Sequence, residues 1–502
     1  MPASSDREYS GNKQVSNASG GTLRNRTARG VLALGFSTVM KYGLQLARMF
    51  ILARLLSPKD FGVIGLSLIV INGLEIFAAL GPDKYIIQKS KLDSKLVGTA
   101  WYLRAILGLI IAIFAMALAP IYAGFSNEPE VEAVLCIIAF ASIAKGLKSP
   151  GLVLAERELK FKKIAIFDTV IASLELGIVS YLASSFGNVL ALAWALVISS
   201  TIETVASFFV FSISERLSWH KESLWELINV GGAFIIVAIG SFIMIQGDNF
   251  MVGKIAGVTL LGYYMVAYRL CELPMNLTLQ ITGRAAYSAF CNVQNDIARR
   301  TYWFLAVFEL QLALLIPASL AVIALANSLI LTIYGSGWEA AVPCLRALGL
   351  VVFGRSLSNL IAPFLLANGH YRFTAKIKII ETLFFLLGVY IGIIEMGLVG
   401  AALGAGFGYI VAALFRLYYL VDVGQVPVSE LVKRLLVAIA CTLPGAVGAL
   451  GCDIVLVGSP LFRLSLGLAW FVACYTSTIL LFRKKLITLF VESFRSVKSN
   501  AI

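Results

Sequence analysis

Long, continuous apolar runs are the feature that most limits what this chain can fold into. Of its 502 residues, 59% are hydrophobic and only 14% are charged, whereas a soluble domain has roughly 45–50% apolar and about 25% charged residues. Many runs reach the roughly 20 apolar residues that a helix needs to cross a bilayer. Because the runs do not alternate with polar residues, a transmembrane β-barrel is excluded. The sequence therefore predicts an all-α polytopic membrane protein.

The apolar runs and their short polar connections predict about fourteen membrane-spanning helices. Their expected limits are 30–53, 61–82, 97–120, 131–155, 164–186, 188–212, 226–247, 255–276, 301–325, 340–367, 372–393, 397–420, 432–453 and 461–482. Residues 1–29 are polar and are expected to form a disordered cytoplasmic tail. Residues 483–502 form a second cytoplasmic tail, with the pattern of an amphipathic helix on the membrane surface.

Positive charge alternates from one connection to the next. If the N-terminus is cytoplasmic, the cytoplasmic loops hold most of the Lys and Arg, and the opposite loops carry only Arg54, Lys59, Lys254 and Arg463. Such an excess marks the cytoplasmic side of membrane proteins, so both termini are expected there. The net charge of +13 is thus an orientation signal, and no nucleic acid partner is expected.

A repeat at an offset of 200 residues relates the segment 27–90 to 227–290, most clearly where Ala47–Arg54 aligns with Gly247–Lys254. The second copy is expected to break between two helices at Gly247–Asn249. The alignment puts acidic Asp248 where the first copy has basic Arg48, which predicts matched cavity positions of opposite charge.

Duplicated halves are common in transporters, whose substrate site lies between the halves. We therefore expect an N-lobe at 30–212, a C-lobe at 226–420 and an added helix pair at 432–482. In the twelfth span, Gly400, Gly404 and Gly408 recur every four residues, a pattern that allows close helix contact.

Charged residues inside the spans are the candidate functional residues, because each costs about 2.5–3.5 kcal/mol at mid-membrane. Several share one helical face, and they have both signs, which indicates a polar cavity lined by the first twelve spans. Several of these charged residues, taken singly, have explanations that involve no function. Lys41, Arg104, Lys145 and Lys148 have stems long enough to reach the membrane surface, Arg48 is near a span end, and Arg269 and Glu272 have the i, i+3 spacing of a structural pair.

Four short sequence patches give the chain a family resemblance. Ala53–Gly62 follows the first span and Gly81–Asp83 ends the second, while Gly247–Lys254 and Leu261–Tyr264 follow the seventh. In these patches and in span number, the chain resembles the Wzx-like polysaccharide flippases of the multidrug/oligosaccharidyl-lipid/polysaccharide exporter superfamily. The resemblance implies two six-helix lobes in a bacterial inner membrane that open alternately to either side. It implies transfer of undecaprenyl-diphosphate-linked oligosaccharide units from the cytoplasmic to the periplasmic leaflet, for exopolysaccharide, capsule or O-antigen assembly.

This substrate has a diphosphate and sugars, which lipid excludes, and a polyprenyl tail, which lipid accepts. The residues expected to contact its polar part are Lys41, Arg48, Lys145, Arg269, Arg355 and Asn359. The residues expected to gate the cavity or to couple it to Na⁺ or H⁺ are Glu75, Asp168, Glu175, Asp248 and Glu272. The expected partners are the lipid-linked oligosaccharide, membrane lipid, and a polysaccharide polymerase with its export machinery. No catalytic residue, metal or cofactor is expected, because no phosphate-binding loop or metal-ligand spacing occurs.

Three other functions remain open. A drug/cation antiporter of the same superfamily would share the fold, but a basic cavity repels organic cations. A membrane polysaccharide polymerase or ligase resembles proteins with a large periplasmic loop, and the outer loops here are short. A scaffold without transport leaves the intramembrane charges without a purpose.

Overall fold

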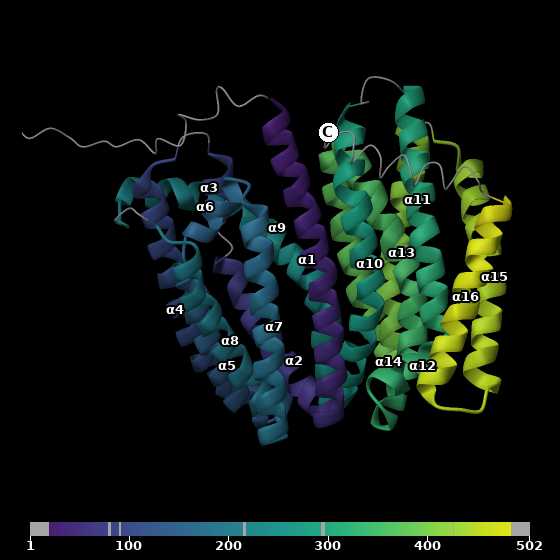
Figure 1. The fold of residues 1–502 in the computed structure, drawn as a ribbon, viewed down its shortest axis with the longest axis horizontal. Helices are drawn as coiled ribbons and strands as arrows, with labels where there is room; N and C mark the ends of the chain where they lie inside the picture. The colour runs from purple at the N-terminus through teal and green to yellow at the C-terminus, as the bar shows by residue number, and fades with distance from the viewer. Residues whose placement is uncertain are drawn as a thin grey trace, which may run out of the picture. The chain divides into compact units, whose positions relative to one another are not determined.

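The structure, a computed structural model, describes residues 20–78, 82–89, 92–213, 217–292, 297–424 and 426–482 (Figure 1). These residues contain helices and no strand. Most of the two predicted tails, residues 1–19 and 483–502, lies outside the described residues. The helices confirm the all-α expectation, and each expected span overlaps at least one helix. Seven of them are long and apolar enough, by length and composition alone, to cross a membrane: α4, α7, α8, α11, α14, α15 and α16.

The helices have the following bounds. The first part of the chain contains α1 Gly20–Leu55, α2 Pro58–Ala78, α3 Pro82–Gln88, α4 Ser94–Ser126, α5 Glu130–Gly146, α6 Gly151–Arg157, α7 Phe161–Phe186, α8 Val189–Val210 and α9 Lys221–Met251. The remainder contains the π-helical turn η1 Val252–Ala256, α10 Val258–Asn292, α11 Ile297–Ala324, α12 Ala326–Ile333, the 3₁₀ turn η2 Ser336–Ala341, α13 Val342–Ala367, α14 Tyr371–Gly424, α15 Val428–Val455 and α16 Pro460–Phe482.

The predicted break at Gly247–Asn249 is wrong, because α9 continues through these residues to Met251. The Asp248 carboxylate and the Asn249 amide nitrogen have partners inside the fold, while Asn249 Oδ1 is buried without one among the described residues. The Asp248 carboxylate accepts hydrogen bonds from the Asn249 backbone N–H and from the Tyr264 hydroxyl. The chain instead turns at Gly257, whose φ of +96° suits glycine. The next helix then runs to Asn292, well beyond the expected end at residue 276.

Three other helix limits differ from the expected ones. The first span was expected from residue 30, but α1 begins at Gly20. The fourth was expected at 131–155 as one helix, but α5 ends at Gly146 and the separate α6 begins after Pro150, which cannot continue a helix. The second was expected to reach residue 82, but α2 ends at Ala78 and the separate, short helix α3 begins at Pro82. The eleventh and twelfth spans are confirmed as two helices within α14, bent at Gly397 with φ 59° and ψ −134°.

The described residues up to Ile245 form one compact unit, the N-terminal unit, and those from Gln246 onward form the C-terminal unit. The division falls inside α9, later than the predicted lobe limits of 212 and 226. The reason is that the start of α9 packs with earlier helices. Leu227 belongs to a buried apolar cluster with Ile86 and Leu96, and Phe242 lies against Gly73.

The same helix pairings occur in both units. In the N-terminal unit, the second span packs on the fourth (α2 on α5), the third on the fourth (α4 on α5) and the fourth on the sixth (α5 on α8). In the C-terminal unit, α10 packs on α13, α11 on α13 and α13 on α14, which are the equivalent pairs of the eighth to twelfth spans. This agreement supports a duplicated core. The added helices α15 and α16 pack on each other and on α11 and α12.

Glycines let the two halves of α14 touch at their backbones. A Cβ atom on Gly404 would lie 2.0 Å from the Gly388 carbonyl oxygen, and one on Gly400 would lie 1.9 Å from that of Gly392. No side chain fits at such distances, so the close contact predicted from the glycine spacing is confirmed.

Candidate functional site

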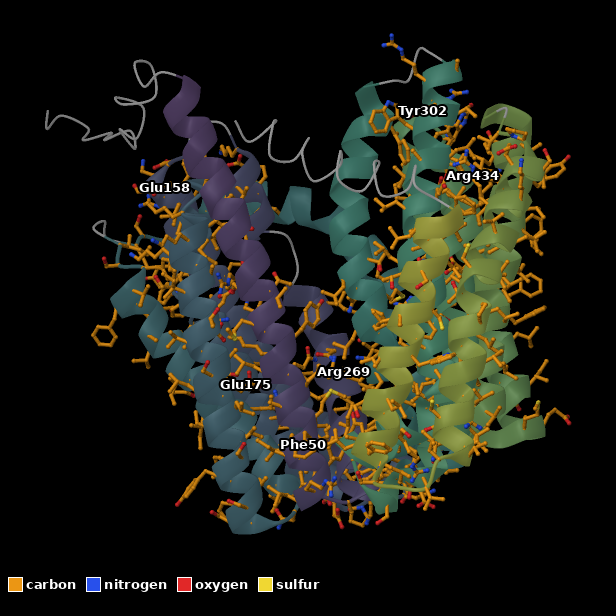
Figure 2. The ribbon with its side chains drawn as sticks, turned by 45° about the vertical axis from the view of Figure 1, so that its right-hand side comes forward. Phe50, Glu158, Glu175, Arg269, Tyr302 and Arg434 are labelled. Atoms are coloured by element: carbon orange, nitrogen blue, oxygen red, sulfur yellow. The ribbon has the colours of Figure 1, made fainter. Side chains whose placement is uncertain are left out.

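Two ion pairs join α1 to α7 in the N-terminal unit. Lys41 Nζ pairs with an Asp168 carboxylate oxygen, and Arg48 pairs in the same way with Glu175. Both pairs join residues 127 apart, so the two helices run in the same direction and in one register. Figure 2 labels Glu175 beside α1. One turn before Lys41, the Ser37 hydroxyl lies 2.9 Å from that of Thr169. We call the two ion pairs the α1–α7 ladder.

Further pairs join the other helices of this unit. Lys145 Nζ lies 2.8 Å from a Glu75 oxygen on α2, and Lys148 Nζ lies 2.6 Å from a Glu203 oxygen on α8. The predicted substrate residues Lys41, Arg48 and Lys145 therefore face the predicted coupling residues Asp168, Glu175 and Glu75. Each of these three cations contacts one of these three carboxylates, so the charges meet in separate pairs between neighbouring helices.

Reversing one rung of the ladder tests whether the pairing matters. Arg48→Glu sets two carboxylates against each other and, if the chain acts in polysaccharide export as its motif resemblance implies, is expected to lower polymer export several-fold. Restoring opposite charges in Arg48→Glu/Glu175→Arg is expected to recover most of it, since contacting residues couple by about 0.5–3 kcal/mol. Export per unit of membrane-inserted protein is the measurement. A double variant no better than the single variants contradicts a functional pair.

The C-terminal unit places opposite charges around one small cavity. Its lining includes Asp248, Tyr268, Glu272, Arg355 and Tyr409 among apolar side chains. Asp248 is 1% exposed, and its Oδ2 accepts a 2.9 Å hydrogen bond from the Tyr264 hydroxyl. The cavity volume is about 20 Å³, enough for roughly one water. A sugar or diphosphate therefore needs this site to open.

Arg355 is held by aromatic residues. One of its NH groups donates to the Tyr268 hydroxyl, and its guanidinium carbon lies 5.8 Å from the Tyr268 ring centre and 5.5 Å from that of Tyr409. In the part of the chain that the structure describes, Arg355 forms no ion pair with a carboxylate. It differs in this respect from Lys41, Arg48 and Lys145.

The other predicted residues fall in two groups. Arg269 lies 3.8 Å from Glu272, which confirms the structural pair that their spacing allows, and Figure 2 labels Arg269 on α10. The side chain of Asn359 lies outside the described residues. Arg48 bonds to the fifth span, whereas the aligned Asp248 is buried against the eighth. Their equivalence as cavity positions stays a prediction.

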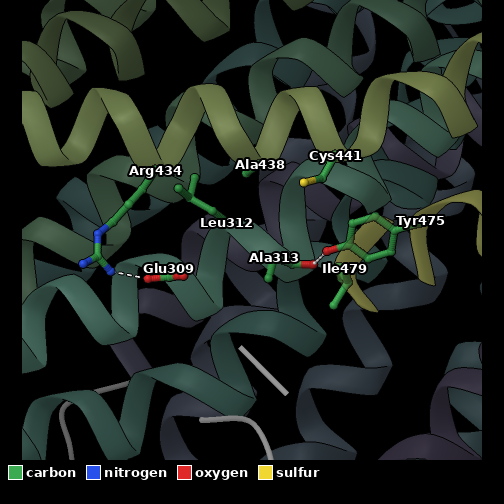
Figure 3. Close-up of a pocket in the computed structure, with 8 residues that line it drawn as sticks. All are labelled: Glu309, Leu312, Ala313, Arg434, Ala438, Cys441, Tyr475 and Ile479. Atoms are coloured by element: carbon green, nitrogen blue, oxygen red, sulfur yellow. Dashed lines mark hydrogen bonds and ion pairs between the residues drawn. The ribbon is translucent and has the colours of Figure 1, made fainter. Parts of the chain in front are cut away.

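A second small cavity lies where α11, α15 and α16 meet (Figure 3). Arg434 pairs there with Glu309, and the Tyr475 hydroxyl donates a 2.5 Å hydrogen bond to the Ala313 carbonyl. These contacts anchor the added helix pair to the C-terminal unit. The remaining lining is mostly apolar, so this cavity has few groups that would recognise a charged ligand.

The residues around this cavity that the sequence interpretation did not propose as site residues are Tyr264, Tyr268 and Tyr409. Tyrosine is ordinary in apolar helices, so composition gave no signal for Tyr409. Tyr264 and Tyr268 were detectable, since they are four residues apart on one helical face beside charged Glu272. Two further pairs were also not anticipated: Glu381 with Arg416, which are both buried, and buried Asp453 with Arg346, whose side chain is 42% exposed.

Comparison with known proteins decides the family. Residues 51–343, more than half of the chain, match the polysaccharide biosynthesis protein family. The chain belongs to this family. The match confirms the resemblance seen in the motifs.

Relatives of this polysaccharide biosynthesis protein include WzxC of Escherichia coli, a lipopolysaccharide biosynthesis protein. It is 23% identical over 391 residues, which are 76% of this chain and 78% of WzxC. ExoT of Rhizobium meliloti, a succinoglycan biosynthesis transport protein, is 23% identical over 320 residues, covering 63% of this chain and 65% of ExoT.

Solved structures of other proteins have a similar fold. The lipid II flippase MurJ, in an inward closed conformation, superposes with a TM-score of 0.74 at 15% identity, over 91% of this chain and all of MurJ. An inward-facing multidrug transporter of the MATE family gives a TM-score of 0.55 at 16% identity, over 84% of this chain and 97% of that transporter. The chain is therefore a multi-pass membrane protein with a transporter fold. Among the similar proteins, ExoT is named as a transport protein and MurJ as a flippase.

Proposed function

We propose that the chain moves undecaprenyl-diphosphate-linked oligosaccharide units from the cytoplasmic to the periplasmic leaflet of a bacterial inner membrane. Two findings together support the proposal. The family is one of polysaccharide biosynthesis proteins, and the fold resembles that of a lipid II flippase. Alternating access would let the polar head cross while the tail stays in lipid. The flipped units supply a polysaccharide polymerase and its export machinery.

The ion pairs suggest how a charged head would be received. Lys41, Arg48 and Lys145 exchange their carboxylate partners for the diphosphate or for acidic sugars as the head enters. Arg269, Arg355 and Asn359 are the other residues that we propose contact the head during transfer. The released carboxylates then gate the cavity or take up Na⁺ or H⁺. In this structure Glu75, Asp168 and Glu175 each form an ion pair with a basic side chain. Carboxylates that already bind positive charge support such an exchange.

The parallel ladder agrees with the expected number of spans between α1 and α7. The first and fifth spans cross in the same direction only if an even number of crossings separates their starts, and the ladder meets that condition. The cytoplasmic placement of both termini is proposed from the basic loops alone.

The leaflet in which substrate accumulates is the test. In cells depleted of this protein, lipid-linked units are expected to collect in the cytoplasmic leaflet, where an impermeant sugar-modifying reagent added to spheroplasts does not reach them. Polymer export is expected to fall as these units accumulate. Accumulation in the periplasmic leaflet contradicts the proposal and favours a polymerase or ligase. Extrusion of cationic dyes with normal polymer favours the antiporter.

A further inference from the structure

Tyr264 and Tyr268 hold two opposite charges of one cavity apart. They lie one turn apart on α10, so their side chains share a helical face. Tyr264 donates its hydroxyl hydrogen to Asp248, and Tyr268 accepts a hydrogen bond from Arg355. Each tyrosine thus binds one member of an acid–base pair that lines the same cavity.

The separation needs a physical reason, because buried opposite charges attract strongly. In a low-dielectric interior, a carboxylate and a guanidinium gain most by direct pairing. The described residues show no ion pair between Asp248 and Arg355, although both line a cavity of about 20 Å³. The other carboxylate of the lining, Glu272, already faces Arg269. The tyrosine hydroxyls take the place of the missing pair.

The arrangement leaves donors for an anion. The guanidinium has five N–H donors, and only one donates to Tyr268 within the described residues. The Tyr268 oxygen accepts that hydrogen bond, so its own hydrogen is available to a ligand. A phosphate oxygen accepts from both groups, and Arg is well suited to phosphate. Direct pairing of Arg355 with Asp248 would remove this site.

We infer that Tyr264 and Tyr268 are positioning residues that keep Arg355 from being neutralised by Asp248, so that Arg355 and the Tyr268 hydroxyl together bind the diphosphate of the substrate. The inference rests on the proposed function for the identity of the ligand. It assigns to the tyrosines a role in keeping charge available, beyond packing.

Removal of one hydroxyl, with and without the competing carboxylate, tests the inference. The probe is undecaprenyl diphosphate, and its dissociation constant is measured on the full-length protein in lipid nanodiscs. Tyr264→Phe and Tyr268→Phe are each expected to weaken binding at least about tenfold. Adding Asp248→Asn is expected to restore affinity in Tyr264→Phe to within about threefold of the wild type, because Arg355 then has no competing partner. In Tyr268→Phe it is expected to restore affinity only in part, because the hydroxyl that contacts the diphosphate is still missing.

Controls separate this effect from misfolding. Tyr263→Phe removes a neighbouring hydroxyl that bonds the Gly337 carbonyl away from the cavity, and it is expected to leave affinity unchanged. Undecaprenol, which lacks the diphosphate, is expected to bind all variants equally. Wild-type affinity in both single phenylalanine variants overturns the inference, as does additive weakening in the double variants.

One further variant distinguishes the two proposals. If Arg355→Gln weakens binding but Asp248→Asn rescues neither tyrosine variant, the spacing role fails while the diphosphate contact stands. If Arg355→Gln binds the probe like the wild type, the diphosphate contact fails and the spacing role fails with it. The leaflet assay tests the direction of transport independently of both.

Discussion

Replacing Arg355 with glutamine is expected to slow flipping at least about 100-fold, which corresponds to about 2.7 kcal/mol of lost stabilisation. Arg355 is the buried-cavity cation that the described residues leave without a carboxylate partner, so its charge is available to a diphosphate. Glutamine keeps polar hydrogen-bonding groups but removes that charge. The measurement is the rate at which a lipid-linked oligosaccharide in proteoliposomes becomes accessible to an impermeant reagent.

Two substitutions sharpen this result. Arg355→Lys keeps the charge but loses the planar fork and its contact with the tyrosine rings, so an intermediate rate is expected. Arg346→Gln changes another arginine of α13, which faces Asp453 and not the cavity, and a rate within about threefold of the wild type is expected. Equal rates for Arg355→Gln and Arg346→Gln refute the assignment of Arg355.

Replacing Glu381 with methionine is expected to destabilise the protein by about 3–5 kcal/mol, because it leaves a buried guanidinium without its carboxylate. Glu381 accepts a 2.9 Å hydrogen bond from Arg416, and both side chains are almost fully buried. The pair joins the two halves of α14 beyond their glycine contact. Thermal unfolding of the purified protein in detergent reports the loss.

The double variant Glu381→Met/Arg416→Met is expected to unfold near the wild-type temperature, since replacing a whole buried pair by apolar groups is often neutral. Lys378→Met provides the matched control. Lys378 also contacts Glu381, at 3.3 Å, but its side chain is 47% exposed, so a change of at most about 1 kcal/mol is expected. A Glu381→Met variant as stable as the wild type refutes a stabilising pair.

Sequence patterns predict the helices of this fold well because lipid leaves the backbone few choices. An apolar run of 20 residues satisfies its own hydrogen bonds only as a helix, so each expected span overlaps a helix, although the fourth divides into α5 and α6. The break at Gly247–Asn249 was misplaced because polarity alone does not end a helix. Tyr264, sixteen residues later, supplies the partner that lets Asp248 stay in α9.

The charged residues inside the spans are visible in the sequence, but residues that contact each other were assigned to separate tasks. The spacing held a signal of the ladder, since Lys41 and Arg48 are seven apart and so are Asp168 and Glu175. Equal spacing of opposite charges predicts two matching rungs if the helices pack in parallel. Arg355 carried no such signal, because its partners are aromatic rings and hydroxyls that join it only in three dimensions.

The α1–α7 ladder also has a consequence for how the chain enters the membrane during synthesis. Lys41 and Arg48 emerge from the ribosome 127 residues before the carboxylates that pair with them. At roughly 5–20 residues per second, that interval lasts about 6–25 s. During this time α1 carries two uncompensated charges, each costly in lipid. The first helix is therefore expected to stay beside the insertion machinery, or to keep its basic side chains in water, until α7 is inserted. The carboxylates of α7 then complete the α1–α7 ladder.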